Sequence, residues 1–97
     1  RESSWEITSI HLLPVRSDAA GFLQPVEHTL PLDGHPIAVP IPDDIGAIRG
    51  ADAELSMAWR FYLRTVLEQA FAAGYSMVDC IHVPSHGWRY VLVREYP

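Results

Sequence analysis

Five histidines and one cysteine are the side chains of this 97-residue chain best suited to hold a metal ion or to act as a nucleophile. His82 and His86 are four residues apart, but the local pattern places one at a strand end and the other in a turn. A structural zinc site needs about four convergent ligands. Two histidines without a third partner therefore predict no metal site, and we expect His86 at an exposed hairpin tip.

Cys80 is the other candidate for chemistry. On a strand, the side chain of His82 would lie about 7 Å further along the same face, too far away for a thiolate–imidazole pair. The predicted pairing of the last two strands places Cys80 on one face with Val78, Val91 and Val93, a setting typical of a small core residue. The sequence predicts that Cys80 packs in the core and is not a nucleophile.

Charged side chains on otherwise apolar elements leave several interpretations open. Asp79 needs a partner, because burying an unpaired carboxylate is costly. An ion pair with Arg94 or another arginine is the favoured interpretation, and a general base is the alternative. Arg60 and Arg64 would bind an anion if both faced a pocket, or would form a solvated or interfacial surface. Neither the GxGxxG motif nor the P-loop motif occurs.

Composition limits the class of protein. The net charge is −5, and the seven basic residues are scattered arginines, which argues against a nucleic-acid partner. No apolar run is long enough to span a bilayer, so we expect no membrane partner. The single cysteine suits a reducing compartment, which makes the cytoplasm the expected location. We expect one domain over residues 1–97; a chain that begins with Arg1 leaves a fragment or C-terminal module of a longer protein as an open alternative.

The longest patterned segment predicts an α helix over residues 52–73. Its period places an apolar stripe on one face, made by Leu55, Trp59, Tyr62, Leu63, Val66, Ala70 and Ala73. The opposite face carries Arg60, Arg64 and Glu68, but also Met57, Phe61 and Phe71. Apolar residues on both faces predict that both faces are covered. Asp52 is the expected N-cap, and Gly74 the expected end of the helix.

The rest of the chain predicts strands near residues 5–13, 27–32, 36–41, 76–83 and 88–96, and a short helical turn over 43–49. Asp33-Gly34 predicts a tight turn that joins the second and third strands in a hairpin. Prolines at 31, 36, 40 and 42 place this hairpin at a sheet edge, or make it an arm that reaches onto another surface. The last two strands form a second hairpin through the loop 84–87, with Val83 opposite Trp88. The predicted fold class is α+β, with a mostly antiparallel sheet.

A family resemblance covers about residues 41–94. It is carried by Ile41-Pro42-Asp43-Asp44-Ile45, Ile48, Asp52, Trp59-Arg60, Arg64, Phe71, Gly74-Tyr75, Val78-Asp79 and Tyr90-Val91-Leu92. This pattern resembles the C-terminal part of predicted acetyltransferases of the GNAT superfamily. The resemblance implies an α+β fold with an antiparallel, partly open sheet and a link to acyl-CoA chemistry. The superfamily's pyrophosphate motif, Q/R-x-x-G-x-G/A, is absent, because Arg49-Gly50-Ala51 lacks its spacing. No catalytic residue carries over, and acetyl-CoA is expected only if a preceding domain supplies its site.

Three functions follow as hypotheses. The leading one is an accessory module of a GNAT-like protein, not catalytic alone, which completes a core or an interface with a second copy or with a preceding GNAT-like domain. The alternatives are a small-molecule, acyl-CoA-like binding domain, with a pocket between the helix and the hairpin 25–41, and an acetyl-CoA-dependent N-acyltransferase. The candidate interface or pocket residues are Met57, Trp59, Arg60, Phe61, Tyr62, Arg64, Phe71, Asp79 and Tyr90.

Overall fold

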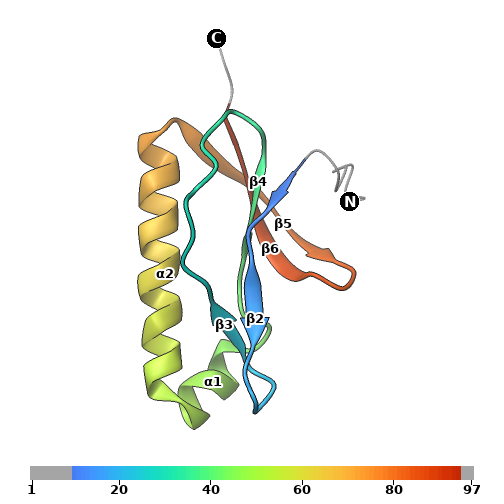
Figure 1. Cartoon of the computed structure of the whole chain (residues 1–97), viewed down its shortest axis with the longest axis vertical. Helices are drawn as coiled ribbons and strands as arrows, with labels where there is room; N and C mark the ends of the chain where they lie inside the picture. Colours follow the sequence, from blue (N-terminus) through green and yellow to red (C-terminus); the bar gives the residue numbers. More distant parts are fainter. Residues whose placement is uncertain (1–9, 95–97) are drawn as a thin grey trace.

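The computed structural model describes residues 10–94. Its elements are β1 His11–Leu12, β2 Val15–Ser17, β3 Leu23–Pro25, β4 Ile37–Pro40, α1 Ile45–Ala51, α2 Ala53–Ala72, β5 Tyr75–Val83 and β6 Gly87–Arg94 (Figure 1). This arrangement confirms the predicted α+β class. Neither described helix combines the length and the apolarity that crossing a membrane requires.

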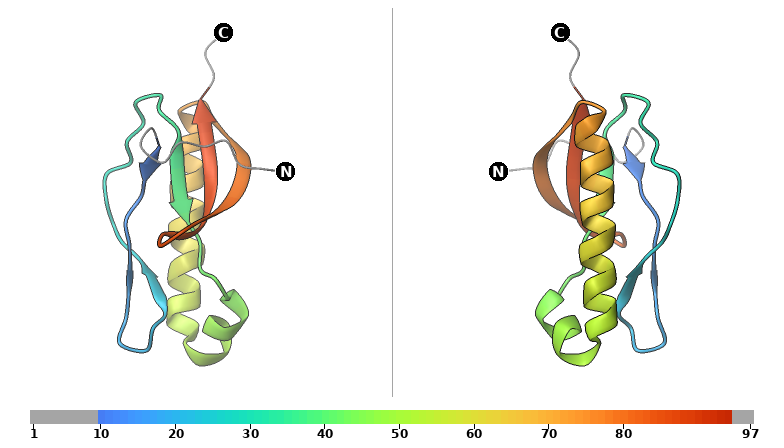
Figure 2. Two further views of the ribbon diagram at one scale, coloured as in Figure 1. Left: turned by 90° about the vertical axis from the view of Figure 1, so that its right-hand side faces the viewer. Right: turned by 90° about the vertical axis from the view of Figure 1, so that its left-hand side faces the viewer.

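Four strands form the main sheet in the order β1-β4-β6-β5. β4 and β5 each pair antiparallel with β6, whereas β1 pairs parallel with β4. α2 runs along one face of this sheet (Figure 2). A separate antiparallel ribbon of β2 and β3 contacts α2 through β3. Both β-layers therefore depend on the same helix for their cover.

The core lies between α2 and the sheet. Ile37 and Val39 alternate along β4 and both belong to the buried cluster with α2. Across the β4–β6 ladder they pair with Leu92 and Tyr90. The buried cluster comprises Leu13, Ile37, Val39, Ile48, Leu55, Trp59, Tyr62, Val66, Ala70, Tyr75 and Leu92. The largest of these side chains is Trp59, which is 1% exposed, and its Nε1 donates to the Leu23 carbonyl at 2.9 Å. This bond joins the β2–β3 ribbon to the helix.

Both helices begin at aspartate caps. The Asp44 side chain accepts from the backbone N–H of Ala47 at the start of α1, and the Asp52 side chain accepts from that of Leu55 at the start of α2. These bonds satisfy donors that the first turn leaves free. Gly74, with φ of +93°, follows the end of α2. The predicted helix 52–73 and helical turn 43–49 are confirmed within a residue or two.

The predicted proline-rich hairpin is wrong. Residues 26–36 contain no strand, and the strand expected over 27–32 is absent. β4 is an inner strand of the sheet, and its four residues are buried. Pro36 precedes β4 and Pro40 is its last residue, so the three residues between them keep their N–H groups for the ladders. Prolines at the ends of a strand do not exclude it from the sheet interior.

The second hairpin forms with a register one residue away from the predicted one over Asp79–Val83, and a bulge between Met77 and Asp79 shifts it by a further residue. Val83 pairs with Gly87 and not with Trp88, because the loop has three residues, with positive φ at Ser85 within it and at Gly87 directly after it. Cys80 lies opposite Tyr90 on the edge strand β5 and is exposed, so the core position predicted for it is wrong. Of the predicted strand 5–13, residues 5–9 lie outside the described residues, as do 95 and 96 of the strand predicted over 88–96.

Candidate functional site

The outer face of α2 carries the most exposed large apolar side chains of the described chain. Met57 is 62% exposed, Phe61 68% and Phe71 47%. With Arg64 and Glu68, which are also exposed, they follow each other at intervals of four, three, four and three residues. We call Met57, Phe61, Arg64, Glu68 and Phe71 the outer stripe. This spacing is that of a coiled-coil seam, which packs against another helix.

The side chains on the inner face of the same helix are buried by the rest of the chain. Leu55, Trp59, Tyr62, Val66 and Ala70 are all buried on this side. At about 100° per residue, these positions lie opposite the outer stripe. The structure therefore separates residues that the sequence had grouped as one candidate surface.

The remaining candidate residues lie in different places. Arg60 is exposed beside the outer stripe. Tyr90 is half-buried and packs against the core on β6. Asp79 is half-buried on β5 opposite Val91, and its Oδ1 accepts from the Cys80 backbone N–H at 2.9 Å. Of the candidate residues, Met57, Arg60, Phe61, Arg64 and Phe71 share the outer surface of α2.

A half-open groove of about 670 Å³ lies between α2 and residues 25–30. Its lining consists of Pro25, Val26, Glu27, His28, Thr29, Leu30, Ala58, Phe61, Tyr62, Thr65, Val66 and Gln69. Inside this lining the Tyr62 hydroxyl lies 3.1 Å from His28 Nε2. Burial raises the pKa of Tyr62 to about 12, partly offset by the charge of Arg89. The phenol is therefore neutral, and the groove presents an apolar surface with a few polar atoms.

Arg89 is a buried cation that sequence reasoning did not single out. It is 2% exposed, and its guanidinium donates to the carbonyls of Leu13, Ala38 and His86 at 2.6, 3.1 and 3.1 Å. Burial lowers the pKa of Arg89, and the nearby Tyr62 opposes this effect. Its three backbone contacts join the residue after β1, β4 and the hairpin loop, which indicates a structural role.

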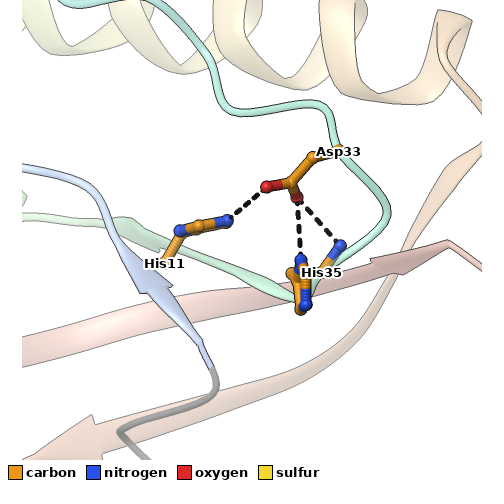
Figure 3. Close-up of side chains that lie close together, drawn as sticks. All are labelled: His11, Asp33 and His35. Atoms are coloured by element: carbon orange, nitrogen blue, oxygen red, sulfur yellow. Dashed lines mark hydrogen bonds and ion pairs between the residues drawn. The ribbon is translucent and has the colours of Figure 1, made fainter.

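Three side chains from two parts of the sequence meet near the start of β4 (Figure 3). His11 Nε2 lies 2.9 Å from Asp33 Oδ2, and His35 Nδ1 lies 3.3 Å from Asp33 Oδ1. The Asp33 Oδ1 also accepts from the His35 backbone N–H at 3.0 Å. That backbone bond, followed by the bond with the His11 ring, lowers the pKa of Asp33 to about 2. Asp33 is therefore an ionised acceptor between two imidazoles.

Sequence spacing did not reveal this cluster. Asp33 and His35 are two residues apart, but His11 is 22 positions away from Asp33 and joins them only because β1 pairs with β4 in parallel register. The pair that the sequence drew attention to is different: His82 and His86 are exposed, and the His82 ring packs edge-on against Trp88. The segment Asp33-Gly34-His35 is the one local indication of the cluster, because this turn carries a carboxylate and an imidazole two residues apart.

Comparison with protein-family models, with curated proteins and with solved structures finds no match to this chain. No activity or ligand is therefore transferred to it from a relative. The outer stripe, the groove and the His11–Asp33–His35 cluster are the features from which function can be inferred.

Proposed function

We propose that this chain is an interaction module in which the outer stripe of α2 pairs with the outer stripe of a second copy. The observation that carries the proposal is the exposure of Met57, Phe61 and Phe71 on a helix whose other face is already buried. Exposed large apolar side chains aligned on one face of a helix are typical of an interface. A second helix of matching pattern would remove them from water.

The stripe is self-complementary when two copies run antiparallel. A two-fold axis on the outer face of α2, at the level of residue 66 along the helix, sets Arg64 of each copy against Glu68 of the other. It also sets Phe61 of each copy against Phe71 of the other. The centre of the interface then contains two ion pairs, and aromatic pairs flank it on both sides. Such an isologous contact uses the same patch on both copies. The charged layers fix the antiparallel register, as polar seam positions do in coiled coils.

The size of the stripe sets the expected strength of the interface. From Met57 to Phe71 the helix rises about 21 Å at about 1.5 Å per residue. A contact of this length between two helices falls among the small, transient interfaces. The central charges also lose part of their hydration on pairing, which offsets some of the gain. We therefore expect a monomer–dimer equilibrium that depends on concentration.

The resemblance of residues 41–94 to the C-terminal part of GNAT acetyltransferases supports an accessory role. In that setting the module would bring two copies of a larger protein together without catalysing a reaction itself. Acetyl-CoA would be held by a preceding domain. The resemblance supplies the biological context, whereas the outer stripe supplies the physical reason for pairing.

The molar mass of the chain in solution, measured across concentration by sedimentation equilibrium, tests this proposal. The wild type should rise from the mass of one chain toward that of two. Phe61→Ser should weaken association about tenfold or more, since an aromatic layer is lost at two symmetric places. Trp88→Ser, which removes an exposed aromatic residue on β6, is the matched control and should associate as the wild type does. A wild type that stays monomeric at all concentrations contradicts the proposal.

A second candidate function is favoured by the groove between α2 and residues 25–30. Its volume of about 670 Å³ lies within the usual range of small-molecule sites, about 300–1,000 Å³. Phe61, Val66 and Leu30 provide apolar contacts, and Glu27 is the only charged carboxylate in the described lining. No arginine lines the groove, so its chemistry fits an uncharged apolar ligand better than the phosphates of an acyl-CoA.

Binding of an apolar fluorescent dye tests this second function. We expect Ala58→Trp, which fills the groove from the exposed side of α2, to reduce dye binding about tenfold or more. Ala53→Trp introduces the same side chain at an exposed position of α2 outside the lining and should leave binding unchanged. Equal binding by both variants would exclude the groove as the dye site. Acetyl-CoA added in excess should give no thermal stabilisation.

A further inference from the structure

We propose that His11, Asp33 and His35 form a binding site for a divalent first-row transition-metal ion. The three residues offer one ligand atom each, and these atoms all lie within 4.8 Å of one another. Their chemistry, two imidazole nitrogens and one carboxylate oxygen, is that of the facial sites that bind such ions. This inference concerns residues that the outer stripe and the groove do not use.

The present distances are close to those that coordination requires. Metal–nitrogen and metal–oxygen bonds of about 2.0–2.2 Å separate neighbouring ligand atoms by about 3.0–3.4 Å. The two contacts of Asp33 are 2.9 Å to His11 Nε2 and 3.3 Å to His35 Nδ1. The two imidazole rings are edge-on, with centroids 5.7 Å apart. Small side-chain rotations would bring all three atoms onto one ion.

The backbone that carries these ligands is held in place. The His11 backbone N–H donates to the Pro36 carbonyl at 2.9 Å, which fixes β1 next to the turn. Gly34 takes φ of +96°, a conformation that favours glycine. The hydroxyl of the buried Tyr75 accepts from the Gly34 N–H at 2.8 Å and donates to the His35 carbonyl at 3.1 Å. A core side chain thus supports the loop between two of the ligands.

The ligand set also indicates which ions fit. Imidazole suits zinc, copper, iron and nickel, whereas calcium and magnesium prefer sites made only of oxygen. Three protein ligands leave at least one coordination position open, as in catalytic sites. The side chains of all three residues are partly exposed, so water or a small ligand can reach that position.

The competing explanation is that Asp33 only bonds the two histidines to fix the loop. Asp33→Asn separates the two cases, because the amide oxygen still accepts from the His35 N–H while the anionic ligand is lost. If Asp33 only fixes the loop, Asp33→Asn leaves the affinity for the metal unchanged. If Asp33 is a ligand, the variant loses affinity.

Calorimetric titration of the metal-free full chain with zinc chloride, at about pH 7.5 where an ordinary imidazole is neutral, tests the proposal. Cobalt chloride provides a second probe, because its visible absorption reports the ligand geometry. We expect one ion per chain in the wild type. Asp33→Asn, and the pair His11→Ala with His35→Ala, should each weaken binding by more than about tenfold.

The matched control removes the same number of histidines elsewhere. His82→Ala with His86→Ala should keep the wild-type affinity and the cobalt spectrum. Tyr75→Phe should weaken binding about tenfold without removing a ligand, and circular dichroism checks that each variant is folded. The proposal is overturned if the wild type takes up no ion, if the control pair loses binding as strongly as the cluster pair, or if Asp33→Asn binds as the wild type does.

Discussion

The two faces of α2 differ in how far their apolar side chains are buried by the rest of the chain. On the inner face, Trp59 is 1% exposed and packs in a cluster with residues from β4, β5 and β6. On the outer face, Phe61 is 68% exposed although it lies only two positions further along the helix. Both side chains are large and aromatic, so their intrinsic tendency to leave water is similar. The chain therefore buries one face of the helix and leaves large apolar side chains of the other face in water.

The inner face should dominate the stability of the isolated chain. Trp59→Ala removes a buried ring and its bond to the Leu23 carbonyl, and should lower the free energy of unfolding by about 3–5 kcal/mol. Phe61→Ala, measured in dilute protein, should change it by no more than about 0.5 kcal/mol. Urea denaturation followed by circular dichroism gives both values. Similar losses in the two variants would remove the distinction between the faces.

The N-cap of α2 should affect stability and leave pairing alone. Asp52→Ala removes the acceptor for the Leu55 N–H and should cost about 1 kcal/mol of unfolding free energy. Asp52 is outside the outer stripe, so the dimer dissociation constant, measured where the variant is folded, should not change. Asp52→Asn, which keeps an oxygen acceptor, should recover most of the loss. A cap variant that abolishes association would mean that pairing follows helix stability and not the stripe.

The smallest expected effect concerns acid stability of the β2–β3 ribbon that packs on α2. Burial acts to raise the pKa of Asp18, but bonds from the Gln24 side chain and from the backbone N–H groups of Phe22, Ala20 and Gly21 outweigh it and lower the pKa. A lowered folded-state pKa gives stability that is present above the unfolded value of 3.8 and is lost as the pH falls through the folded value.

Asp18→Asn should therefore flatten the pH dependence of unfolding below about pH 4, as chemical denaturation at several pH values would show. Stability at neutral pH should fall slightly, because part of the bonding is lost. A variant whose acid limb is as steep as that of the wild type would show that Asp18 does not contribute to it.

The helix and the last hairpin could be predicted because their signals are local. A 3.6-residue period, an aspartate cap and Gly74 define α2 without reference to the rest of the chain. The error about β4 concerns contacts between distant segments. β4 is an inner strand because β1 and β6 pair with it, and no local pattern around Pro36 and Pro40 contains that information.

The contrast between local signals and distant contacts also explains which candidate functional residues could be predicted. Residue spacing alone predicts that both faces of the helix carry apolar side chains. In the structure Met57, Phe61 and Phe71 are exposed on the outer face. The cluster at His11 was not predictable, because the parallel pairing of β1 with β4 brings it next to His35. The register of the last hairpin depended on positive φ at Ser85, a residue that rarely adopts it.

Charge reversal across the stripe is the most direct test of antiparallel pairing between two copies. Arg64→Glu sets like charges against each other at both central layers, and Glu68→Arg does the same with the opposite sign. Each variant alone should be monomeric, although both should fold, since a like-charge pair within a helix costs only about 0.5 kcal/mol. Mixed in equal amounts, the two variants should form a heterodimer, because every cross-helix pair is then complementary.

Light scattering at a fixed total concentration decides the question. The account predicts the mass of one chain for each variant alone and a rise toward two chains for the mixture, with the double variant Arg64→Glu/Glu68→Arg associating as the wild type does. A mixture that remains monomeric, where the wild type dimerises, would contradict the antiparallel register and with it the proposed use of the outer face of α2.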